Sequence, residues 1–210
     1  MESGIQEPLQ DRSMQTMNQI LDAASELLEE RLFEEISIAE IVARAGCSVG
    51  AFYGRFKDKS ALLFALDEYH FQDFIVAANA LIAEIQSENR GLQEVIRSVV
   101  QFLVDAYGRR PGLLRALVLY AKQHHDEGFR LRERRAWALY PQLHQIILNH
   151  AAEMDCPDPN FAVRFGFMQV FFTASEILLW GTRNEDFPVS ADQLVTELTR
   201  TYLAYLGVNP

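Results

Sequence analysis

The chain has 210 residues, 49% of them hydrophobic and 23% charged, with a formal net charge of −10 at pH 7. This composition is typical of a globular protein built from one large domain, or from a small domain joined to a larger one. No apolar run approaches the ~20 residues of a membrane span, and the acidic N-terminus has no signal-peptide core, so we expect a cytoplasmic protein. The acidic balance excludes a general nucleic-acid coat, whose non-specific affinity would rest on neutralising phosphates.

The first part of the chain predicts a tail followed by a helix. Residues 1–11 are polar and acidic and are expected to form a mobile tail. Apolar residues then recur at helical spacing from about Ser13 to Leu32, as at Ile20 and Leu27. The polar face of this helix is strongly acidic and is expected to be solvated.

The stretch from Ser37 to Lys59 predicts a pair of short helices. Ser37 is expected to cap the first of them, because Glu40 three residues later can close a capping box. Gly46 suits the left-handed C-cap of that helix, and Ser48 can cap a second helix over the segment VGAFYGRF. Two short helices joined by a tight glycine-containing turn are the sequence form of a helix-turn-helix.

The local charge around this helix pair is opposite to that of its surroundings. Residues 1–60 hold 6 Lys and Arg against 11 Asp and Glu, a net of −5, whereas residues 44–59 sum to +3. The local surplus comes from four cations and one carboxylate: Arg44, Arg55, Lys57, Lys59 and Asp58. A basic spot on an acidic body favours one docking orientation on a polyanion. The helix-turn-helix is therefore predicted to bind DNA.

The rest of the chain predicts further helices and no strands. Asp158 with Pro159, and Ser190 with Gln193 in a second capping box, mark the starts of the last two helices. The expected helices run from Asp58 to Ser87, Gly91 to Tyr107, Leu113 to His124, Asp126 towards Met154 with a bend near Pro141, Pro159 to about Gly181, and Ser190 to about Leu206. We therefore predict an all-α fold of about nine helices.

The penultimate helix is apolar on two faces. The residues of one face are Phe161, Phe165, Met168 and Phe172, and those of the other are Phe167, Phe171, Ala174 and Leu178. A helix that is apolar on both sides must be buried on both, so one face can serve the core and the other a symmetric partner. The pattern leaves open which face does which. A larger monomeric core is the alternative.

A set of spaced residues near the N-terminus forms a recognisable motif. Its positions are Ile20-Leu21, Ala23-Ala24, Leu27, Ser37, Ile41, Ala45-Gly46, Ser48, Gly50, Tyr53, Phe56, Lys59 and Leu62. This pattern resembles the N-terminal domain of TetR-family transcriptional regulators, with one departure at Leu32, where the family usually has glycine. The resemblance implies a helix-turn-helix DNA-binding domain over residues 12–58 and a helical effector-binding and dimerisation domain over residues 59–210.

The resemblance implies that the second short helix enters the major groove of DNA. Val49 and Ala51 then suit contacts with thymine methyl groups, and Arg55 suits a forked contact with guanine. The residues expected to contact phosphates are Ser37, Arg44, Ser48, Tyr53, Lys57 and Lys59. The alternative for Tyr53 is a core-edge aromatic, and for Lys57 and Lys59 it is plain solvation.

The resemblance also implies a small-molecule site and a dimer interface in the C-terminal domain. Candidate effector-binding residues are Phe102, Tyr107, Tyr120, His124, Trp137, Tyr140, His144, Phe167, Phe171 and Trp180. Such a lining favours a hydrophobic or aromatic effector, and core packing is the alternative for each residue. In the family the last two helices commonly form the dimer interface, and the candidates here are Phe161, Phe165, Met168, Phe172, Leu194, Leu198, Tyr202 and Tyr205.

The function expected from these features is sequence-specific regulation of transcription. The resemblance implies a homodimer, most often a repressor, that leaves a palindromic operator when a small effector binds. The sequence shows no nucleophile–base set, phosphate loop or metal-ligand spacing, so we expect no catalysis, cofactor or metal. One rival is a helical small-molecule binder or enzyme with an incidental helix-turn-helix, which requires a polar catalytic set in the C-terminal core. Another is an architectural DNA binder, which requires a basic surface.

A cluster of arginines after His125 has two interpretations. Its members are Arg130, Arg132, Arg134 and Arg135. They suit an anionic ligand or partner, but pairing with Glu127 and Glu133 on a solvated face is the favoured interpretation.

Overall fold

The computed structural model describes residues 9–88, 90–124, 134–181 and 188–208, with side chains from residue 13 onward. Within these ranges the regular elements are all helices, and no strand is present, which confirms the all-α prediction. The elements are α1 (Leu9–Glu30), η1 (Phe33–Glu35), α2 (Ile38–Ala45), α3 (Val49–Tyr53), α4 (Lys59–Ser87), α5 (Leu92–Gly108), α6 (Pro111–His124), α8 (Tyr140–Leu148), η2 (Ala151–Glu153), α9 (Pro159–Trp180) and α10 (Ala191–Tyr205).

The predicted helix caps are present. The Ser37 hydroxyl accepts a hydrogen bond from the Glu40 amide at 3.2 Å, and the Glu40 carboxylate accepts one from the Ser37 amide at 2.8 Å. Gly46 ends α2 with a φ of 67°, in the left-handed region where a side chain would be strained. The Ser48 hydroxyl caps α3, and Ser190 with Gln193 forms the second capping box at α10. Each serine cap satisfies a donor that the first helical turn leaves unpaired, and the Gly46 amide satisfies carbonyls of the last turn of α2.

Three helices differ from the sequence prediction. α1 begins at Leu9 rather than Ser13 and ends at Glu30. α3 ends at Tyr53, because the chain turns at Gly54 instead of continuing to Phe56. The helix predicted from Asp126 begins outside the described residues, and it does not run through Pro141: a turn at residues 138–139 precedes α8. Pro141 lies in the first turn of α8, where its missing donor costs nothing.

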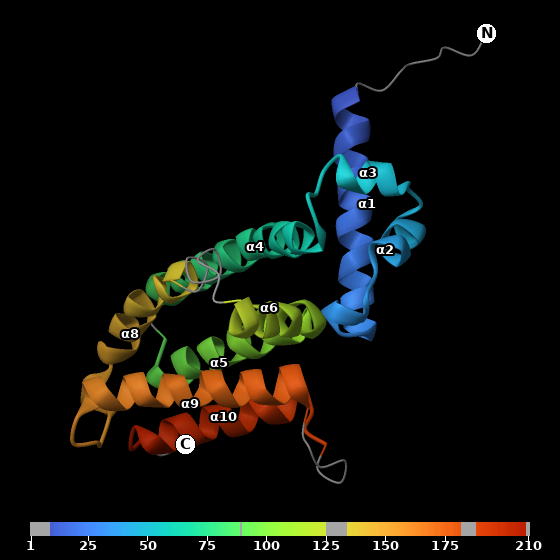
Figure 1. Cartoon of the computed structure of the whole chain (residues 1–210). Coiled ribbons are helices and arrows are strands. Elements are labelled where there is room, and N and C mark those ends of the chain that lie inside the picture. The colour runs from blue at the N-terminus through green and yellow to red at the C-terminus, as the bar shows by residue number, and fades with distance from the viewer. Residues whose placement is uncertain (1–8, 89, 125–133, 182–187, 209–210) are drawn as a thin grey trace.

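Figure 1 shows how the helices are arranged. We call α1, α2 and α3 with their connections the head; it lies at one side of the molecule, and α4 runs from it towards α8. At the opposite end from the head's free tip, α9 and α10 lie side by side beneath α5, and both pack on α5. α6 lies between these two parts and packs on α1 as well as on α9. The head is therefore joined to the rest through both α4 and α6.

The described buried residues form two hydrophobic clusters. One contains the apolar face of α9 together with residues from α4, α5, α8 and α10. The other joins the head to the first turns of α4 and to three residues of α6, namely Leu113, Ala116 and Leu117. A boundary after residue 58 would therefore divide a continuous cluster, and the helix-turn-helix is supported by α6 as well as by its own helices.

The contact between α6 and α1 is unusually close. A Cβ at Gly112 would lie 2.8 Å from the Glu29 Cα and nearer still to the Leu28 carbonyl, so only glycine fits. The Gly112 amide donates to the Glu29 carboxylate at 2.9 Å, and Arg110 donates to the buried Ser25 hydroxyl at 2.6 Å. The α6–α1 junction thus combines backbone contact with polar bonds.

One helix among the described residues, α9, is long and apolar enough to cross a membrane by length and composition alone. Helices α5, α8 and α10 pack on it, and residues such as Phe167, Val170 and Ala174 are buried there. Gly166 lets the ring of buried Tyr202 approach α9, and the Tyr202 hydroxyl donates to the Val163 carbonyl at 2.6 Å. One of the two apolar sides of α9 is thus used in the core of one chain.

Candidate functional site

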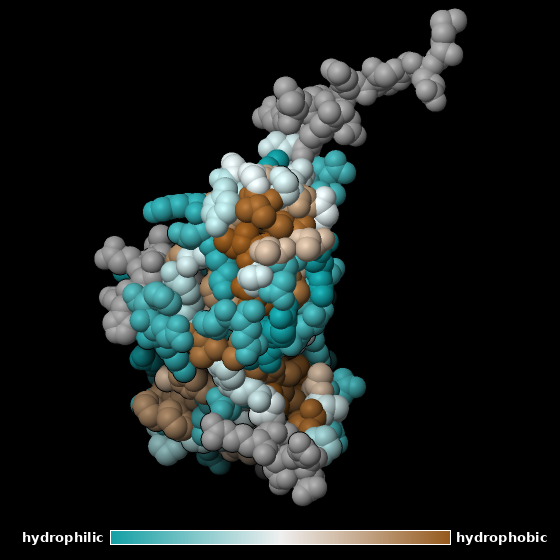
Figure 2. All heavy atoms as spheres, turned by 45° about the vertical axis from the view of Figure 1, so that its right-hand side comes forward, coloured by the Kyte–Doolittle hydropathy of each residue, from teal (hydrophilic) through white to brown (hydrophobic). Residues whose placement is uncertain are grey.

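The outer surface of α3 is apolar and aromatic rather than charged. Val49 is 47% exposed and Tyr53 is 57% exposed, and Ala51 is half-buried. Beneath them Phe52 is fully buried and contacts the rings of both Tyr53 and Phe56 at centroid distances of 5.4 Å. Figure 2 shows an apolar patch in the upper part of the molecule, surrounded by more hydrophilic surface. Phe52 is the buried anchor that holds α3 with Val49 and Tyr53 facing outward.

The two serines predicted to contact phosphates are both helix caps. The Ser37 hydroxyl donates to the Glu40 carboxylate at 2.7 Å, and these hydrogen bonds, with help from Arg31, lower the pKa of Glu40 to about 2. The Ser48 hydroxyl accepts from the Ala51 amide at 3.1 Å. Both side chains remain exposed. Their first role is to start α2 and α3, and any phosphate contact would be additional.

Two of the predicted phosphate-binding cations are engaged within the chain. Arg44 forms a two-pronged ion pair with Glu30, at 2.6 and 3.2 Å, and its hydrogen bond lowers the pKa of that carboxylate. Lys59 donates to the carbonyls of Phe33 at 2.6 Å and Ile36 at 2.9 Å, with its Nζ 4.3 Å from the centre of the Phe33 ring. Burial accordingly lowers the pKa of Lys59.

These contacts correct the expected role of Lys59. Its ammonium group is held against carbonyls between η1 and α2, so it joins α4 to the head instead of reaching outward to a phosphate. Arg44 is directed towards the acidic face of α1, where its charge is already neutralised. Lys57, by contrast, is exposed, and no hydrogen bond or ion pair joins it to another described residue. Lys57 is the cation of this stretch best placed for a phosphate.

Arg55 also has partners inside the head. Its Nη1 donates to the Ala51 carbonyl at 2.8 Å. Its Nε and Nη2 both donate to the Ser13 carbonyl, at 3.3 and 3.2 Å, and Nη2 also reaches the Ser13 hydroxyl at 3.3 Å. The pair of N–H groups expected to contact guanine is thus directed at α1. Ser13 was not predicted as a site residue, and a partner 42 positions away leaves no signal in local sequence.

Six of the ten predicted effector-binding residues lie together as one aromatic cluster. Its members come from α5, from the segment before α8, and from α8 and α9: Tyr107, Trp137, Tyr140, His144, Phe167 and Phe171. The closest pair is Tyr140 and Phe167, at 4.8 Å between ring centres, and Trp137 is 38% exposed at the edge. The Tyr140 hydroxyl is buried without a hydrogen-bond partner among the described residues, and burial raises the pKa of Tyr140.

The other four predicted effector-binding residues lie elsewhere. Tyr120 and His124 stack at 4.0 Å near the end of α6, where Tyr120 contacts Phe33 and Phe64 of the head and α4. Phe102 packs on Phe74 between α5 and α4. Trp180 ends α9 and is 39% exposed. These positions do not join the cluster, and their part in effector binding stays a prediction.

The structure resolves which face of α9 belongs to the core. Phe167, Phe171, Ala174 and Leu178 face inward, whereas four residues of the other face are exposed: Phe161, Phe165, Met168 and Phe172, at 57, 41, 44 and 57%. Tyr205 of α10 is 38% exposed and lies 5.6 Å from Phe165 between ring centres. We call these five exposed residues the outer apolar face.

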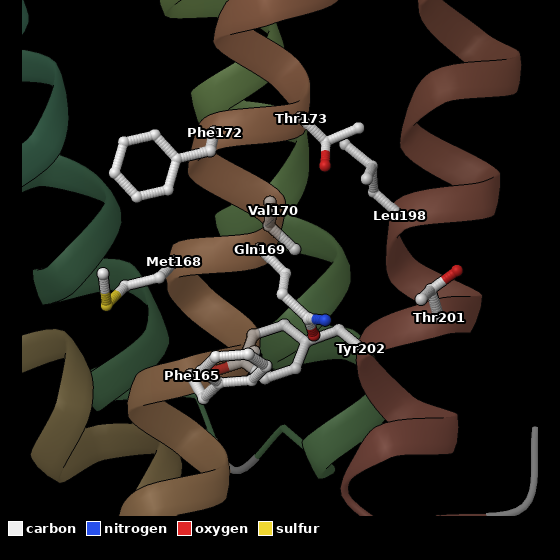
Figure 3. A pocket seen from close by; sticks show the side chains of 10 residues that line it. Phe165, Met168, Gln169, Val170, Phe172, Thr173, Leu198, Thr201 and Tyr202 are labelled. Carbon is white, nitrogen blue, oxygen red and sulfur yellow. The ribbon is translucent and has the colours of Figure 1, made fainter.

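Three residues predicted for the dimer interface belong instead to the core of one chain. Leu194, Leu198 and Tyr202 are only 3, 8 and 1% exposed, because α10 is enclosed by α5 and α9 on two sides. Leu198 and Tyr202 form the floor of a groove of about 420 Å³ between α9 and α10. Figure 3 shows Gln169 extending across this groove, while Phe172 and Met168 project from α9. Gln169, Thr173 and Thr201 line it and were missed, since they are polar.

No group of three His, Cys, Asp or Glu side chains in the described part of the chain could hold a metal ion. The arginine cluster lies partly outside the described residues, at Arg130 and Arg132. Arg135 pairs with Glu68 of α4 at 3.0 Å and lies over the Phe71 ring. Arg135 therefore pairs with α4, whereas its expected partners Glu127 and Glu133 lie outside the described residues.

The all-α fold, with a capped helix pair presenting α3 at the tip of a larger helical body, defines a helix-turn-helix protein. The model of the family described as "Bacterial regulatory proteins, tetR family" matches residues 20–66. The HTH-type transcriptional regulator CymR of Pseudomonas putida is 27% identical over 95 residues, which are 45% of this chain and 47% of CymR. The match thus spans about half the length of that curated relative.

Solved structures share the fold over nearly the whole chain. A tetR-family regulatory protein from Rhodococcus RHA1 has a TM-score of 0.65 at 15% identity, covering 93% of this chain and 98% of its own. A TetR/AcrR-family regulator from Thermobifida fusca has a TM-score of 0.63 at 22% identity, and the match covers 92% of this chain and 98% of that regulator. FadR from Bacillus subtilis, solved with stearoyl-CoA, has a TM-score of 0.61 at 17% identity, and the match covers 91% of this chain and 98% of FadR. Residues 20–66 therefore match the tetR family, whose transcription regulators in general are not enzymes, and the chain shares the fold of these solved regulators over nearly its whole length.

Proposed function

We propose that the chain is a homodimeric, ligand-responsive repressor that binds a palindromic DNA operator and leaves it when a small hydrophobic or aromatic effector binds. The observation that carries the proposal is the outward face of α3. It is presented by capped, well-anchored helices within the family's DNA-binding domain. A DNA-binding regulator acts where the DNA is, so we propose a cytoplasmic location and no membrane partner.

On the DNA side, α3 would enter the major groove with Val49 and Ala51 towards thymine methyl groups. Tyr53 and Lys57 are exposed beside them and suit phosphate contacts. With few polar groups directed at bases, sequence-dependent shape and flexibility of the DNA would supply part of the specificity. Two heads would reach successive major grooves about 34–36 Å apart, or a multiple of that distance.

The second copy would dock on the outer apolar face of α9 and α10. Five large apolar side chains lie together on one surface there, stacked in part, as with Phe161 and Phe165 at 5.7 Å between ring centres. Exposed apolar patches of this kind typically mark an interface, and a two-fold axis through a helix pair buries the same patch on both copies. The groove beside Gln169 gives the partner's side chains a place to insert.

The effector would bind at the aromatic cluster of α5, α8 and α9. Phe167 at its centre is buried, Trp137 at its edge is partly exposed, and the buried Tyr140 hydroxyl has no described partner. A mostly apolar lining with a single free polar group is typical of small-molecule sites. FadR, of the same fold, holds stearoyl-CoA, a compound with a long apolar chain. To release DNA, the effector must bind better to a form whose heads no longer fit the operator.

The experiment that tests the proposal follows the effector site and DNA release together. The chain has two tryptophans, so Trp180→Phe leaves Trp137 as the only one, and Trp137→Phe is the matched control. A panel of apolar and aromatic compounds is titrated while tryptophan emission and binding of a fluorescent operator are followed. We expect a compound that changes Trp137 emission to release the operator, with no emission change from Trp180. Release without any change at Trp137 would place the effector elsewhere.

A further inference from the structure

The side chain of Arg55 completes the end of α3. Helix α3 has five residues, so its last carbonyls lack the usual donors of a longer helix. The donor expected for the Ala51 carbonyl is the Arg55 amide, but that amide donates to Phe52 at 2.9 Å. The guanidinium of the same residue replaces it, with Nη1 2.8 Å from the Ala51 oxygen. A cation at the C-terminus of a helix also suits its dipole.

The opposite edge of the guanidinium is bound to another helix. Nε and Nη2 converge on the carbonyl of Ser13 at 3.3 and 3.2 Å, and Nη2 also contacts the Ser13 hydroxyl. Ser13 lies one turn inside α1, which begins at Leu9. One rigid, planar group therefore connects the end of α3 to the exposed start of α1, across a separation of 42 residues in sequence.

This geometry conflicts with a role in reading bases. A forked contact with guanine needs two parallel N–H groups on one edge of the guanidinium. The Nε–Nη2 edge is already directed at Ser13, and Nη1 is held at Ala51. To contact a base, Arg55 would have to release both helices and leave the Ala51 carbonyl without its donor.

We propose that Arg55 is a positioning residue that clamps α3 against α1 and supports operator binding through α3 without contacting a base. The proposal rests on the DNA-binding function proposed above. Base contacts then fall to the residues that α3 presents outward, with Val49 foremost. The clamp fixes the angle at which α3 leaves the head, which decides whether Val49 and Tyr53 reach the groove together.

The first test is the base preference of Arg55→Ala. Affinities are measured for the operator selected by the wild-type protein and for every single-base variant of one half-site. A clamp predicts that Arg55→Ala weakens all of them by about the same factor, of tenfold or more, and keeps the rank order. A base reader predicts instead that discrimination at one base pair, about 5- to 150-fold for a forked contact, collapses. That collapse would overturn the proposal.

Lys57→Ala is the matched control, because it removes one positive charge two residues away without removing a clamp. The slope of log affinity against log salt decreases in magnitude by about 0.9 for each phosphate that the protein no longer neutralises. We expect this decrease in Lys57→Ala and an unchanged slope in Arg55→Ala. A decrease of the slope in Arg55→Ala would identify Arg55 as a phosphate-binding residue and overturn the clamp.

The second test needs no DNA and separates failure of the clamp from failure of the proposed function. Amide hydrogen exchange is compared in the free wild-type protein, Arg55→Ala and Arg55→Lys. The lysine ammonium is one compact donor group on a flexible stem, so it lacks the planar fork with which Arg55 binds acceptors on two helices from opposite edges. We expect amide exchange to be faster than in wild type in α3 and the first turns of α1 of both variants, with a smaller increase in Arg55→Lys. Exchange in α5 and α9 should be unchanged. Unchanged exchange in α3 would overturn the clamp, even if wild-type protein selects an operator.

Discussion

The α6–α1 junction predicts a large effect for a very small substitution, Gly112→Ala. A single added methyl group at this position would meet the backbone of Leu28 and Glu29 rather than a side chain that could rotate away. Helices α1 and α6 must therefore separate. Their separation would also stretch the bond from the Gly112 amide to the Glu29 carboxylate and that from Arg110 to Ser25.

The magnitude follows from three contributions. Overpacking of a well-packed contact costs about 1–3 kcal/mol. Weakening two hydrogen bonds at a partly exposed junction adds about 1 kcal/mol, and replacing glycine by alanine returns about 0.4–1 kcal/mol through the unfolded chain. The free energy of unfolding should therefore fall by about 1–3.6 kcal/mol. For a chain of this length the thermal midpoint should fall by roughly 2–14 °C.

Gly108→Ala is the matched control for this prediction. Gly108 is the last residue of α5, and a Cβ there would meet nothing within 4 Å. The same chemical change should leave stability unchanged or raise it by up to about 1 kcal/mol. Thermal and urea unfolding of both variants is followed by circular dichroism at equal protein concentration. If Gly112→Ala were as stable as Gly108→Ala, the close contact between α6 and α1 would be refuted.

Three further predictions follow from the buried and exposed side chains. Phe172→Glu should weaken the dimer by over 100-fold, about 3 kcal/mol, as measured by sedimentation velocity. Tyr69 on α4 is similarly exposed, and Tyr69→Glu should leave the dimer intact. Equal sedimentation of both variants would show that the outer apolar face is not the interface. Tyr202→Phe should lower the free energy of urea unfolding by about 1 kcal/mol, because the hydrogen bond to Val163 is removed; wild-type stability would contradict this. Burial lowers the pKa of His70, and the positive charge of Arg110 lowers it further. Together they outweigh Asp73 and Asp22, whose negative charges raise it. The unfolded chain thus binds the proton more tightly, so stability should fall as pH drops below about 6.5, and this dependence should weaken in His70→Gln; an identical pH profile would show that His70 is not responsible.

Features set by local chemistry were predictable from the sequence. The caps at Ser37, Ser48 and Ser190 and the left-handed Gly46 depend on residues within four positions of one another, so short patterns suffice to find them. The exposed apolar residues of α9 were also anticipated as one of two faces. Periodicity shows that a face is apolar, but it does not name the neighbour that covers it.

The roles of the charged residues were not predictable, because their partners are distant in sequence. Lys59 finds carbonyls 23 and 26 positions before it, and Arg55 finds Ser13. By sequence position both cations belong to a basic patch, whereas in the folded head both join elements together. Tyr202 shows the same limit for apolar residues, since α10 is covered by α5 as well as by α9.

Sequence-specific operator binding by a dimer is tested most directly by selecting binding sites from a random pool of DNA duplexes with the purified protein at moderate salt. We predict recovery of an inverted repeat, with half-site centres about 10 base pairs apart or a multiple of that spacing. The selection should be repeated with protein denatured, stripped of any bound compound and refolded, because a copurified effector would hold the heads apart. A folded, dimeric, stripped protein that enriches no sequence, or only a single half-site, would contradict a dimeric operator-binding regulator.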